Sequence, residues 1–238
     1  MKMKEMPQSS KEAQLLVSEV FGPTIQGEGA SLGLPCAFLR LGGCNQKCVF
    51  CDTPYTWDAS RFDLRKELRS ESVASLVEQI MALRVKALVV SGGEPMLQQE
   101  GLRVLNELLR QNGVHVEVET AGTIACMWPD LFDQYNVSPK LANSGNALSV
   151  RYNPRALDSL MQTGRANFKF VVSNPDELGD VDALVEKHGL SPVYIMPEGI
   201  HSDAIRKTSL EIVDAVIRRG YRLTPRLHID LWGNTRGR

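Results

Sequence analysis

Three cysteines stand close together in the chain, at Cys44, Cys48 and Cys51, in a C-x3-C-x2-C arrangement. They follow an apolar run that predicts a strand, so they belong to the loop that leaves it. A flexible loop can wrap three thiolates round one cluster, whereas a regular strand or helix would point them apart. Closed iron–sulfur and zinc sites use four protein ligands. Three ligands leave one iron open to a reacting molecule, so the spacing predicts a 4Fe-4S cluster that takes part in chemistry.

Three alternatives remain open for these cysteines. One is a structural zinc site, which needs a fourth ligand from Cys36, Cys126 or one of the four histidines. Another is a four-ligand electron carrier completed by Cys36. The third is a set of unrelated buried cysteines. Neither Cys36 nor Cys126 belongs to a second C-x2-C pair, and the loop also carries Gly42-Gly43 and polar residues. These features favour the three-ligand cluster.

The elements that must position this loop alternate along the chain between short apolar runs and helical patterns. Strands are expected at 36–41, 87–90, 114–118, 135–137, 168–172, 193–196 and from 221 onward. Helices are expected where apolar residues recur every three or four positions, at 73–80, 102–109, 176–188 and 203–219. Such alternation is typical of parallel strands with right-handed crossovers, in either a barrel or an open sheet.

Polar and glycine-rich residues gather directly after these strands. They occur at 42–44, 91–94, 119–120, 138–140 and 197–199. In βα barrels the loops at the carboxyl ends of the strands build the active site. Strand ends are also ordinary turns, which explains the glycines, but turns explain Glu94, Glu119 and Lys140 less well. The pattern predicts a ring of site residues at the mouth of a barrel.

The composition is that of an ordinary globular protein, with 43% hydrophobic and 23% charged residues among 238. That length suits one domain, and we expect it over residues 15–238, after a disordered stretch at 1–14. The 27 basic and 28 acidic side chains argue against direct binding of nucleic acid. The first residues lack the apolar core of a signal peptide, and no run of 18 apolar residues occurs. We therefore expect a cytoplasmic protein that does not contact a membrane.

The cysteine loop resembles that of the radical S-adenosylmethionine (SAM) superfamily, whose C-x3-C-x2-C signature has an aromatic residue before the last cysteine, here Phe50. The run Ser91-Gly-Gly-Glu-Pro95 resembles the glycine-rich SAM motif of that superfamily. Glycines let the backbone approach a ligand closely, and a carboxylate can accept from an ammonium group. The resemblance implies a 4Fe-4S cluster, SAM, and an α/β fold in the form of a partial (β/α) barrel of the radical SAM type in a single domain.

The resemblance narrows to the 7-carboxy-7-deazaguanine synthase family. The matching runs are 21–29, 38–44, 51–53, 138–140, 196–199, 227–228, 231–234 and 236–237, and the similarity as a whole covers about residues 17 to 238. This similarity implies a radical SAM lyase that converts 6-carboxy-5,6,7,8-tetrahydropterin into 7-carboxy-7-deazaguanine and releases ammonia, in queuosine and deazapurine biosynthesis, a tRNA modification pathway. It further implies Mg²⁺, a homodimer, and an electron donor of the flavodoxin or ferredoxin type. A 5′-deoxyadenosyl radical would take hydrogen from C6 of the pterin, and SAM would be re-formed.

The resemblance also implies roles for individual residues. The cluster would bind Cys44, Cys48 and Cys51, and Mg²⁺ would bind Thr53. SAM contacts are expected at Phe50, Cys51, Asp52, Gly93, Glu94, Glu119, Ser138, Pro139, Lys140, Met196, Pro197, Glu198 and Gly199. Substrate contacts are expected at Ile25, Gln26, Gly27, Arg40, Ser91 and Arg238.

Several of these residues also have a structural interpretation. Arg40 lies on an otherwise apolar strand, where an unpaired charge is costly, so it needs an anion. That anion is the substrate carboxylate or a structural partner such as Glu28. Thr53 would also suit the cap of a turn, and His228 and Trp232 would suit the core or a dimer interface.

A second candidate enzyme is a radical SAM activase that takes hydrogen from a glycine of a partner protein. It would need a surface that binds polypeptide, and the matches at 25–28 and near the end of the chain speak against it. A hydrolase has no support, because no histidine stands in a triad or metal-binding arrangement. The charged stretch 57–72 is expected as a solvated loop that could act as a lid.

Overall fold

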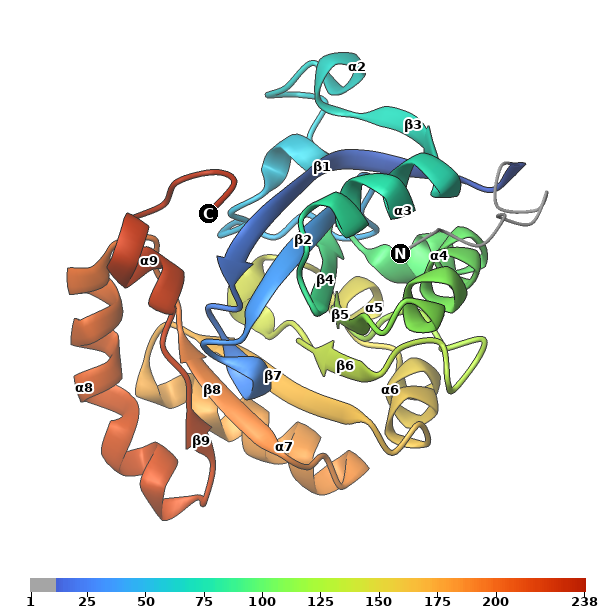
Figure 1. Ribbon diagram of the computed structural model, residues 1–238. Coiled ribbons are helices and arrows are strands. Elements are labelled where there is room, and N and C mark those ends of the chain that lie inside the picture. The colour runs from blue at the N-terminus through green and yellow to red at the C-terminus, as the bar shows by residue number, and fades with distance from the viewer. Residues whose placement is uncertain (1–11) are drawn as a thin grey trace.

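The computed structural model describes residues 12–238, and its central element is one curved sheet of nine strands (Figure 1). The strand order is β3-β1-β2-β4-β5-β6-β7-β8-β9. The strands are β1 (Gln14–Ile25), β2 (Pro35–Leu41), β3 (Arg69–Ser72), β4 (Ala87–Gly92), β5 (His115–Thr120), β6 (Gln134–Val137), β7 (Ala166–Val172), β8 (Val193–Pro197) and β9 (Arg222–Leu223). From β2 to β9 all neighbouring strands are parallel, whereas β1 runs antiparallel to β2 and β3.

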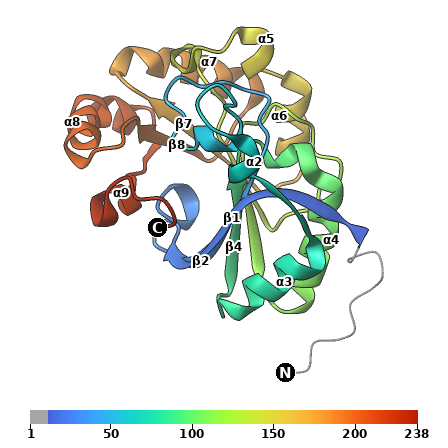
Figure 2. The same cartoon turned by 90° about the horizontal axis from the view of Figure 1, so that it is seen from above.

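Helices cover the outer face of the sheet, which curves round the interior of the molecule (Figures 1 and 2). The longer helices α3 (Val73–Ala82), α4 (Gln99–Gln111), α6 (Pro154–Met161), α7 (Leu178–His188) and α8 (Ser202–Arg218) lie on this face. The short helices are α2 (Leu64–Glu67), α5 (Leu148–Arg151) and α9 (Leu227–Trp232). Within residues 12–238 the edge strands β3 and β9 do not pair with each other. The expected partial barrel in a single α/β domain is confirmed.

The apolar patterns of the sequence form the core between the sheet and the helices. β4 is buried along Ala87–Ser91, as expected of a parallel strand that is covered on both faces. α3 buries the apolar face that its periodicity predicts, and Ser72 caps the helix by accepting a hydrogen bond from the Ser75 N–H. The four longer helices expected from the sequence are present, with ends that differ by a few residues.

The sequence did not predict two of the strands, β1 and β3. β1 contains Gly22-Pro23, residue types that usually mark a turn, and its register against β2 shifts between Phe21 and Thr24. Gly22 has a φ of +144°, and a Cβ there would lie 2.9 Å from the Ala37 Cα. The strand therefore bends at a position that requires glycine. β3 shows no apolar alternation because it is a polar edge strand.

Smaller departures concern the ends and connections of the chain. The stretch 57–72 is not simply a solvated loop, because it contains α2 and β3. The short helices α5, α6 and α9 are also absent from the sequence-based prediction. Most of the stretch expected to be disordered, residues 1–11, lies outside the described residues, and Gln14 already belongs to β1. Between residues 12 and 238 no helix is both long and apolar enough to cross a membrane.

Candidate active site

A cavity of about 420 Å³ opens at the carboxyl ends of the parallel strands. Its walls come from the ends of β2, β4, β5, β6, β7 and β8, from the cysteine loop, and from residues 234–238. The volume lies in the range of small-molecule sites. The polar loops that the sequence singled out therefore face one shared cavity.

Most of the residues expected to bind a ligand line this cavity. They are Ile25, Gln26, Gly27, Arg40, Cys44, Cys48, Phe50, Cys51, Asp52, Thr53, Ser91, Gly93, Glu119, Ser138, Lys140, Met196, Glu198, Gly199 and Arg238. Three expected SAM contacts, Glu94, Pro139 and Pro197, are not part of the lining. The structure thus brings the larger set together, and the ligand that each residue contacts stays a prediction.

The three clustered cysteines project from the loop after β2, and each sulfur accepts a hydrogen bond from an N–H group. The donors are the Gln46 backbone to Cys44 (3.4 Å), Asn146 Nδ2 to Cys48 (3.3 Å) and Trp57 Nε1 to Cys51 (3.3 Å). Such N–H donors stabilise the negative charge of thiolate ligands and tune iron–sulfur clusters. The donor set therefore fits a cluster held by three sulfurs on the wall of the cavity.

Burial also affects the protonation of these thiols. Burial raises the pKa of Cys44 to about 12. Burial likewise raises the pKa of Cys48, although the positive charge of Lys140 works in the opposite direction. Without a metal both side chains would remain protonated at neutral pH. Iron would displace these protons, because a coordinating thiol is deprotonated by the ion's charge.

Among residues 12–238, neither Cys36 nor Cys126 is placed to act as a fourth ligand beside the three clustered cysteines. Cys36 sits at the amino end of β2, packed with Ala87 and Val89, whereas Cys44 follows the opposite end of that strand. The Cys126 sulfur contacts the Trp128 carbonyl oxygen at 3.1 Å. Over residues 12–238 no group of three or more His, Cys, Asp or Glu side chains is spaced to hold a metal ion. Ligands of one zinc ion lie within about 4 Å of each other, whereas a four-iron cluster spreads its sulfurs further apart.

The glycines after β4, Gly92 and Gly93, allow close packing within the fold as well as lining the cavity. A Cβ on Gly92 would lie 2.2 Å from the Leu41 carbonyl oxygen, and one on Gly93 would lie 1.9 Å from the Gly43 carbonyl oxygen. These glycines therefore allow the loop after β4 to lie directly against the cysteine loop, and the Glu94 N–H donates to the Gly43 carbonyl at 2.8 Å. Gly92 and Gly93 thus lie against the backbone of Leu41 and Gly43.

Glu94, which is expected from the sequence to contact SAM, is held by groups of the protein, and its contact with SAM stays a prediction. Its side chain is fully buried, and its carboxylate accepts hydrogen bonds from the Met96 N–H (3.0 Å), the Ala121 N–H (2.7 Å) and the Thr120 hydroxyl (2.8 Å). Burial raises the pKa of Glu94, against the effect of these donors. The carboxylate fastens the loop after β4 to the end of β5, and so positions both loops at the cavity.

A buried group of charges forms one side of the cavity, centred on Glu28. Its carboxylate pairs with Lys169 on β7 and with Arg226 Nε at 2.9 Å. Arg226 also pairs with Asp52, and it donates to the Gly199 carbonyl at 2.7 Å. Burial alone would raise the pKa of Glu28, but the charges of Lys169 and Arg226 hold it below its ordinary value. One arginine thus ties the loops after β1 and β8 to the residue that follows Cys51.

Glu119, at the end of β5, faces the same cavity and is held by neutral donors. Gln26 Nε2 donates to it at 3.2 Å, and the Ser91 hydroxyl donates to it at 3.2 Å. The Lys169 ammonium group lies 3.9 Å away. Three chain segments therefore converge on the Glu119 carboxylate. The Glu119 side chain keeps a quarter of its surface exposed, which leaves room for a ligand to bind it.

Arg40 and Thr53 keep binding capacity for a ligand. Arg40 uses its Nε to pair with Glu19 at 2.7 Å, so its structural partner is Glu19 and not Glu28. Between residues 12 and 238 the terminal guanidinium nitrogens of Arg40 form no hydrogen bond. Among the described residues the Thr53 hydroxyl has one hydrogen-bond partner, the Cys51 sulfur at 3.8 Å, while the Thr53 backbone carbonyl accepts from the Thr56 hydroxyl. Thr53 therefore both closes a turn and presents an oxygen to the cavity.

The side chain of His228 packs directly against Gly27. A Cβ on Gly27 would lie 2.0 Å from the His228 Nδ1, so the glycine makes room for the imidazole ring at the cavity wall. Burial lowers the pKa of His228, although the Glu28 carboxylate opposes that effect. His228 is thus a neutral wall residue of the cavity. Trp232, its neighbour on α9, is 36% exposed and does not line the cavity.

Known proteins are similar to this chain in sequence and in fold. Residues 39–139 match the model of the radical SAM superfamily. The 7-carboxy-7-deazaguanine synthase of Pyrobaculum aerophilum is 40% identical over 240 residues, which cover 96% of this chain and all of that protein. The enzyme of the same name from Rhodopirellula baltica is 34% identical, over 96% of this chain and 90% of its own length. The chain belongs to the 7-carboxy-7-deazaguanine synthase family.

A solved structure of this family has the same fold. QueE from Escherichia coli superposes with a TM-score of 0.69 at 29% identity, over 90% of this chain and 95% of that one. Membership of this family, within the radical SAM superfamily, implies the 4Fe-4S cluster and SAM. The sulfurs of Cys44, Cys48 and Cys51, with their N–H donors, fit the 4Fe-4S cluster.

The sequence did not single out several residues of the family's cavity in this chain. Lys169 stands between two phenylalanines on β7, so the signal that singled out Arg40, a charge on an apolar strand, was present there too. Arg226 lies between Pro225 and Leu227 with no comparable pattern. Other wall residues without an earlier assignment are Phe21, Phe38, Gln46, Tyr55, Trp57, Asn136, Val171 and Arg236.

Proposed function

We propose that this chain converts 6-carboxy-5,6,7,8-tetrahydropterin into 7-carboxy-7-deazaguanine with release of ammonia, and so supplies queuosine biosynthesis. Its relatives are named for this product. One observation carries the proposal: three hydrogen-bonded cysteine sulfurs lie on the wall of the same cavity as Arg40 and Glu119. A polypeptide substrate, as in an activase, would need an open groove. A small acid fits a cavity of about 420 Å³.

Cys44, Cys48 and Cys51 would hold the cluster, and the ends of β4, β6 and β8 would hold SAM. When bound, these groups supply the radical that removes hydrogen from C6 of the pterin. Ser138 and Lys140 form one side of the SAM site, and the Lys140 ammonium group is held by the Ser138 carbonyl (2.8 Å) and hydroxyl (3.0 Å). A fixed cation at this point suits a carboxylate.

The pterin would lie between the β1–β2 side of the cavity and the end of β5. Its donor groups suit the Glu119 carboxylate, which Gln26 and Ser91 orient. Its carboxylate suits the terminal nitrogens of Arg40, which Glu19 holds from the other side. The paired charges of Glu28, Lys169 and Arg226 keep this wall rigid. Such fixed groups orient a substrate and require little rearrangement during the reaction.

Magnesium is the second metal of the proposal. The Thr53 hydroxyl oxygen faces the cavity near Cys51, and Mg²⁺ keeps several waters and needs few protein ligands. The remaining ligands would come from water and from the substrate carboxylate. Thr53→Ser keeps the oxygen and Thr53→Val removes it, so the stimulation of activity by Mg²⁺ should survive in the first variant and disappear in the second. Equal stimulation in both would remove Thr53 from the proposal.

An electron donor would dock beside Cys48. Val49 is 76% exposed and Leu148 is 59% exposed, and Asn146 joins their loops by bonding both the Lys47 N–H (2.9 Å) and the Cys48 sulfur (3.3 Å). Lys47 is exposed close to Val49 in the sequence, and a cation beside apolar surface suits a small acidic electron-transfer protein of the flavodoxin or ferredoxin type. Lys47→Glu should slow reduction by such a donor and leave reduction by dithionite unchanged. Because these donors and reduced thiols occur in the cytoplasm, we propose that location.

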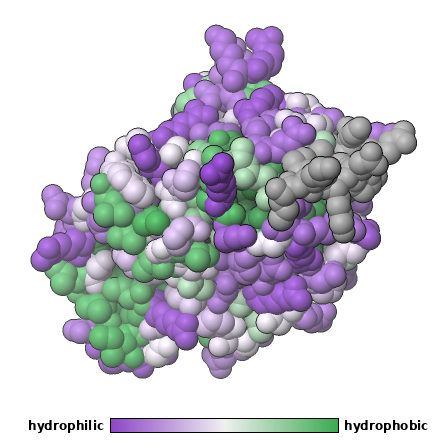
Figure 3. Space-filling model, viewed as in Figure 1, coloured by the Kyte–Doolittle hydropathy of each residue, from purple (hydrophilic) through white to green (hydrophobic). Residues whose placement is uncertain are grey.

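The homodimer would use α8 and the neighbouring sheet edge. Leu210 and Ile217 lie two turns apart on one face of α8 and are 69% and 68% exposed, and Leu223 on the edge strand β9 is 38% exposed. Figure 3 shows apolar residues gathered over this side of the molecule. A second copy of the chain would cover this surface. Sedimentation should give a dimer for the native chain and a monomer for Leu210→Asp/Ile217→Asp; a dimeric double variant would place the interface elsewhere.

An anaerobic assay tests the proposed reaction. The reconstituted protein, with SAM, Mg²⁺ and a reductant, should form 7-carboxy-7-deazaguanine and ammonia from the carboxylated tetrahydropterin. The matched control is Cys48→Ala, which keeps the cavity and lacks one cluster ligand, and it should form neither product. A native protein that cleaves SAM and leaves the pterin unchanged would refute the proposed substrate.

A further inference from the structure

Residues 234–238 run back across the cavity after α9, and all five of them line it. We call them the closing segment. α9 ends at Trp232, and Gly233 follows with a φ of +66°, a conformation that glycine adopts without strain. The chain then turns toward β1 and α2, on the far side of the cavity mouth (Figure 1).

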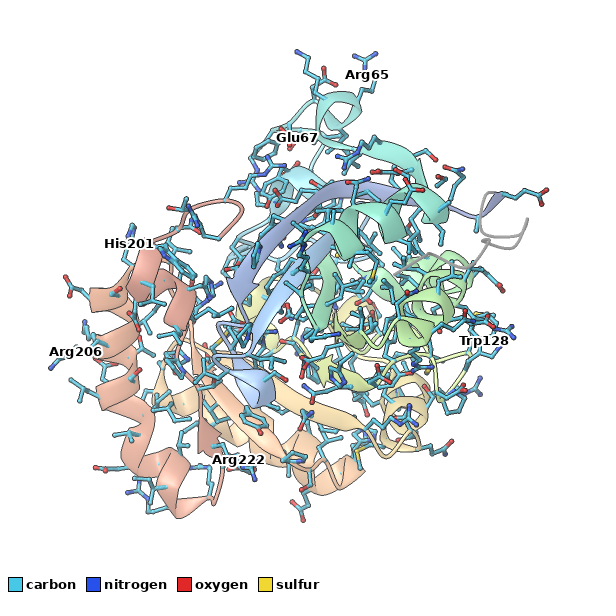
Figure 4. The ribbon with its side chains drawn as sticks, viewed as in Figure 1. Arg65, Glu67, Trp128, His201, Arg206 and Arg222 are labelled. Carbon is cyan, nitrogen blue, oxygen red and sulfur yellow. The ribbon has the colours of Figure 1, made fainter. Side chains whose placement is uncertain are left out.

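Arg236 makes the contacts that hold the closing segment in this position. Its Nε lies 3.1 Å from a Glu19 oxygen, one terminal nitrogen lies 2.9 Å from a Glu67 oxygen, and the other lies 3.4 Å from the Ser18 hydroxyl. Its guanidinium carbon lies 3.9 Å from the centre of the Tyr55 ring, which is close enough for a cation–π interaction. Figure 4 labels Glu67 at the base of α2. Across residues 12–238, every hydrogen bond between the closing segment and β1 or α2 belongs to Arg236.

Glu19 links this anchor to the cavity. One of its oxygens accepts from Arg40 Nε at 2.7 Å and from the Tyr55 hydroxyl at 3.0 Å, and its other oxygen accepts from Arg236. One carboxylate is thus shared between a cation inside the cavity and a cation on the closing segment. An anion that binds Arg40 competes for its charge, and the Glu19 carboxylate then interacts more strongly with Arg236.

We propose that Arg236 is a positioning residue that fastens the closing segment over the cavity, and that Glu19 couples this fastening to an anion bound at Arg40. The identity of that anion, the pterin carboxylate, rests on the function proposed above. Arg236 itself touches no reacting group. Its effect is to retain the bound substrate and keep water out while the reaction proceeds.

Amide hydrogen exchange of residues 233–238 measures the fastening without any activity. In the protein without substrate, Arg236→Met should exchange at least about tenfold faster than native, because it loses charge-assisted hydrogen bonds. Glu67→Gln, which loses one of them, should show a smaller increase. Arg222→Met is the matched control, because Arg222 pairs with Tyr194 on β8, and its exchange at 233–238 should equal that of the native protein. Exchange within twofold of native in Arg236→Met would overturn the anchor.

The coupling is tested with 6-carboxypterin, an oxidised analogue that carries the carboxylate. It should slow exchange at 233–238 in the native protein and have no such effect in Arg236→Met. In the reaction, Arg236→Met should raise KM about tenfold with kcat within twofold of native, and Arg236→Lys should restore part of the loss. Equal slowing of exchange by the analogue in native and Arg236→Met would overturn the coupling. If the native enzyme made no deazaguanine, the proposed function would fail while faster exchange without substrate would still support the anchor.

Discussion

Replacing Lys169 by methionine tests whether the paired charges at the cavity stabilise the fold. Methionine keeps much of the lysine's length and removes its charge. The Lys169 side chain is 9% exposed, and its ammonium group pairs with Glu28 and lies 3.9 Å from Glu119. The loss of one partner from a buried pair costs about 3–5 kcal/mol. Since Arg226 stays 2.9 Å from Glu28, we expect the lower end, about 3 kcal/mol.

Thermal and denaturant unfolding of the anaerobically purified protein measure this loss. For a domain of this size about 3 kcal/mol corresponds to a midpoint lower by about 6–12 °C. The matched control is Lys66→Met, because Lys66 pairs with Asp63 at 3.9 Å with 83% of its side chain exposed. The control should stay within about 0.5 kcal/mol of native.

A double variant separates the charge pair from other effects of the substitution. In Glu28→Gln/Lys169→Met no unpaired anion remains at this position, so the double variant should lose less stability than the sum of the two single variants. The reasoning fails if Lys169→Met is as stable as Lys66→Met, or if the two single losses simply add.

Four further predictions concern the cluster, the packing, the pH dependence and the substrate. Alanine at Cys44, Cys48 or Cys51 should abolish iron and sulfide binding after anaerobic reconstitution, whereas Cys36→Ala and Cys126→Ala should keep it; iron loss in either of the last two would indicate a fourth ligand. Gly27→Ala should cost about 1–3 kcal/mol, because its Cβ would lie 2.0 Å from His228, while Gly179→Ala, with open space around it on α7, should be neutral or stabilising by up to about 1 kcal/mol; equal effects would refute the contact. Burial lowers the pKa of His228 in the folded protein, so as pH falls the unfolded chain takes up this proton first, at about pH 6.5. The free energy of unfolding should therefore fall as pH drops from 7 through 6. His228→Gln should flatten that part of the curve of unfolding free energy against pH, and an unchanged slope would contradict this. Arg40→Met should weaken pterin binding about ten- to a hundred-fold through the loss of a charge-assisted hydrogen bond and leave SAM affinity unchanged; a fall in SAM affinity would make Arg40 structural.

Local patterns predicted the parts of this protein that depend on neighbouring residues in the sequence. The apolar runs of β4 to β8 and the periodic faces of α3, α4, α7 and α8 all appear where expected. The cysteine loop and the residues after the strands could also be found, because parallel strands bring their carboxyl ends to one mouth. β1 was not predicted as a strand because it contains Gly22-Pro23, where it bends. Its pairing with β2 supplies the hydrogen bonds that the local pattern does not suggest.

The pairing of side chains could not be predicted in the same way. Glu28 meets Lys169 and Arg226 across 141 and 198 positions of sequence, and no local pattern encodes such distant partners. Glu94 has the residue type expected of a ligand-binding carboxylate, yet its oxygens accept hydrogen bonds from the Met96 N–H in its own loop and from the Ala121 N–H in the loop after β5. Arg40 required an anion, as its strand implied, and the fold supplies Glu19 from the neighbouring strand β1.

The fate of the hydrogen at C6 tests the proposed enzyme most directly. The native chain, reconstituted anaerobically, would be given the carboxylated tetrahydropterin with deuterium at C6, together with SAM in less than equimolar amount. We predict that deuterium appears in recovered SAM and that more than one molecule of deazaguanine forms for each SAM supplied. One-to-one consumption of SAM, with 5′-deoxyadenosine accumulating beside the product, would show that SAM is a co-substrate and would contradict the proposed reaction at this cavity.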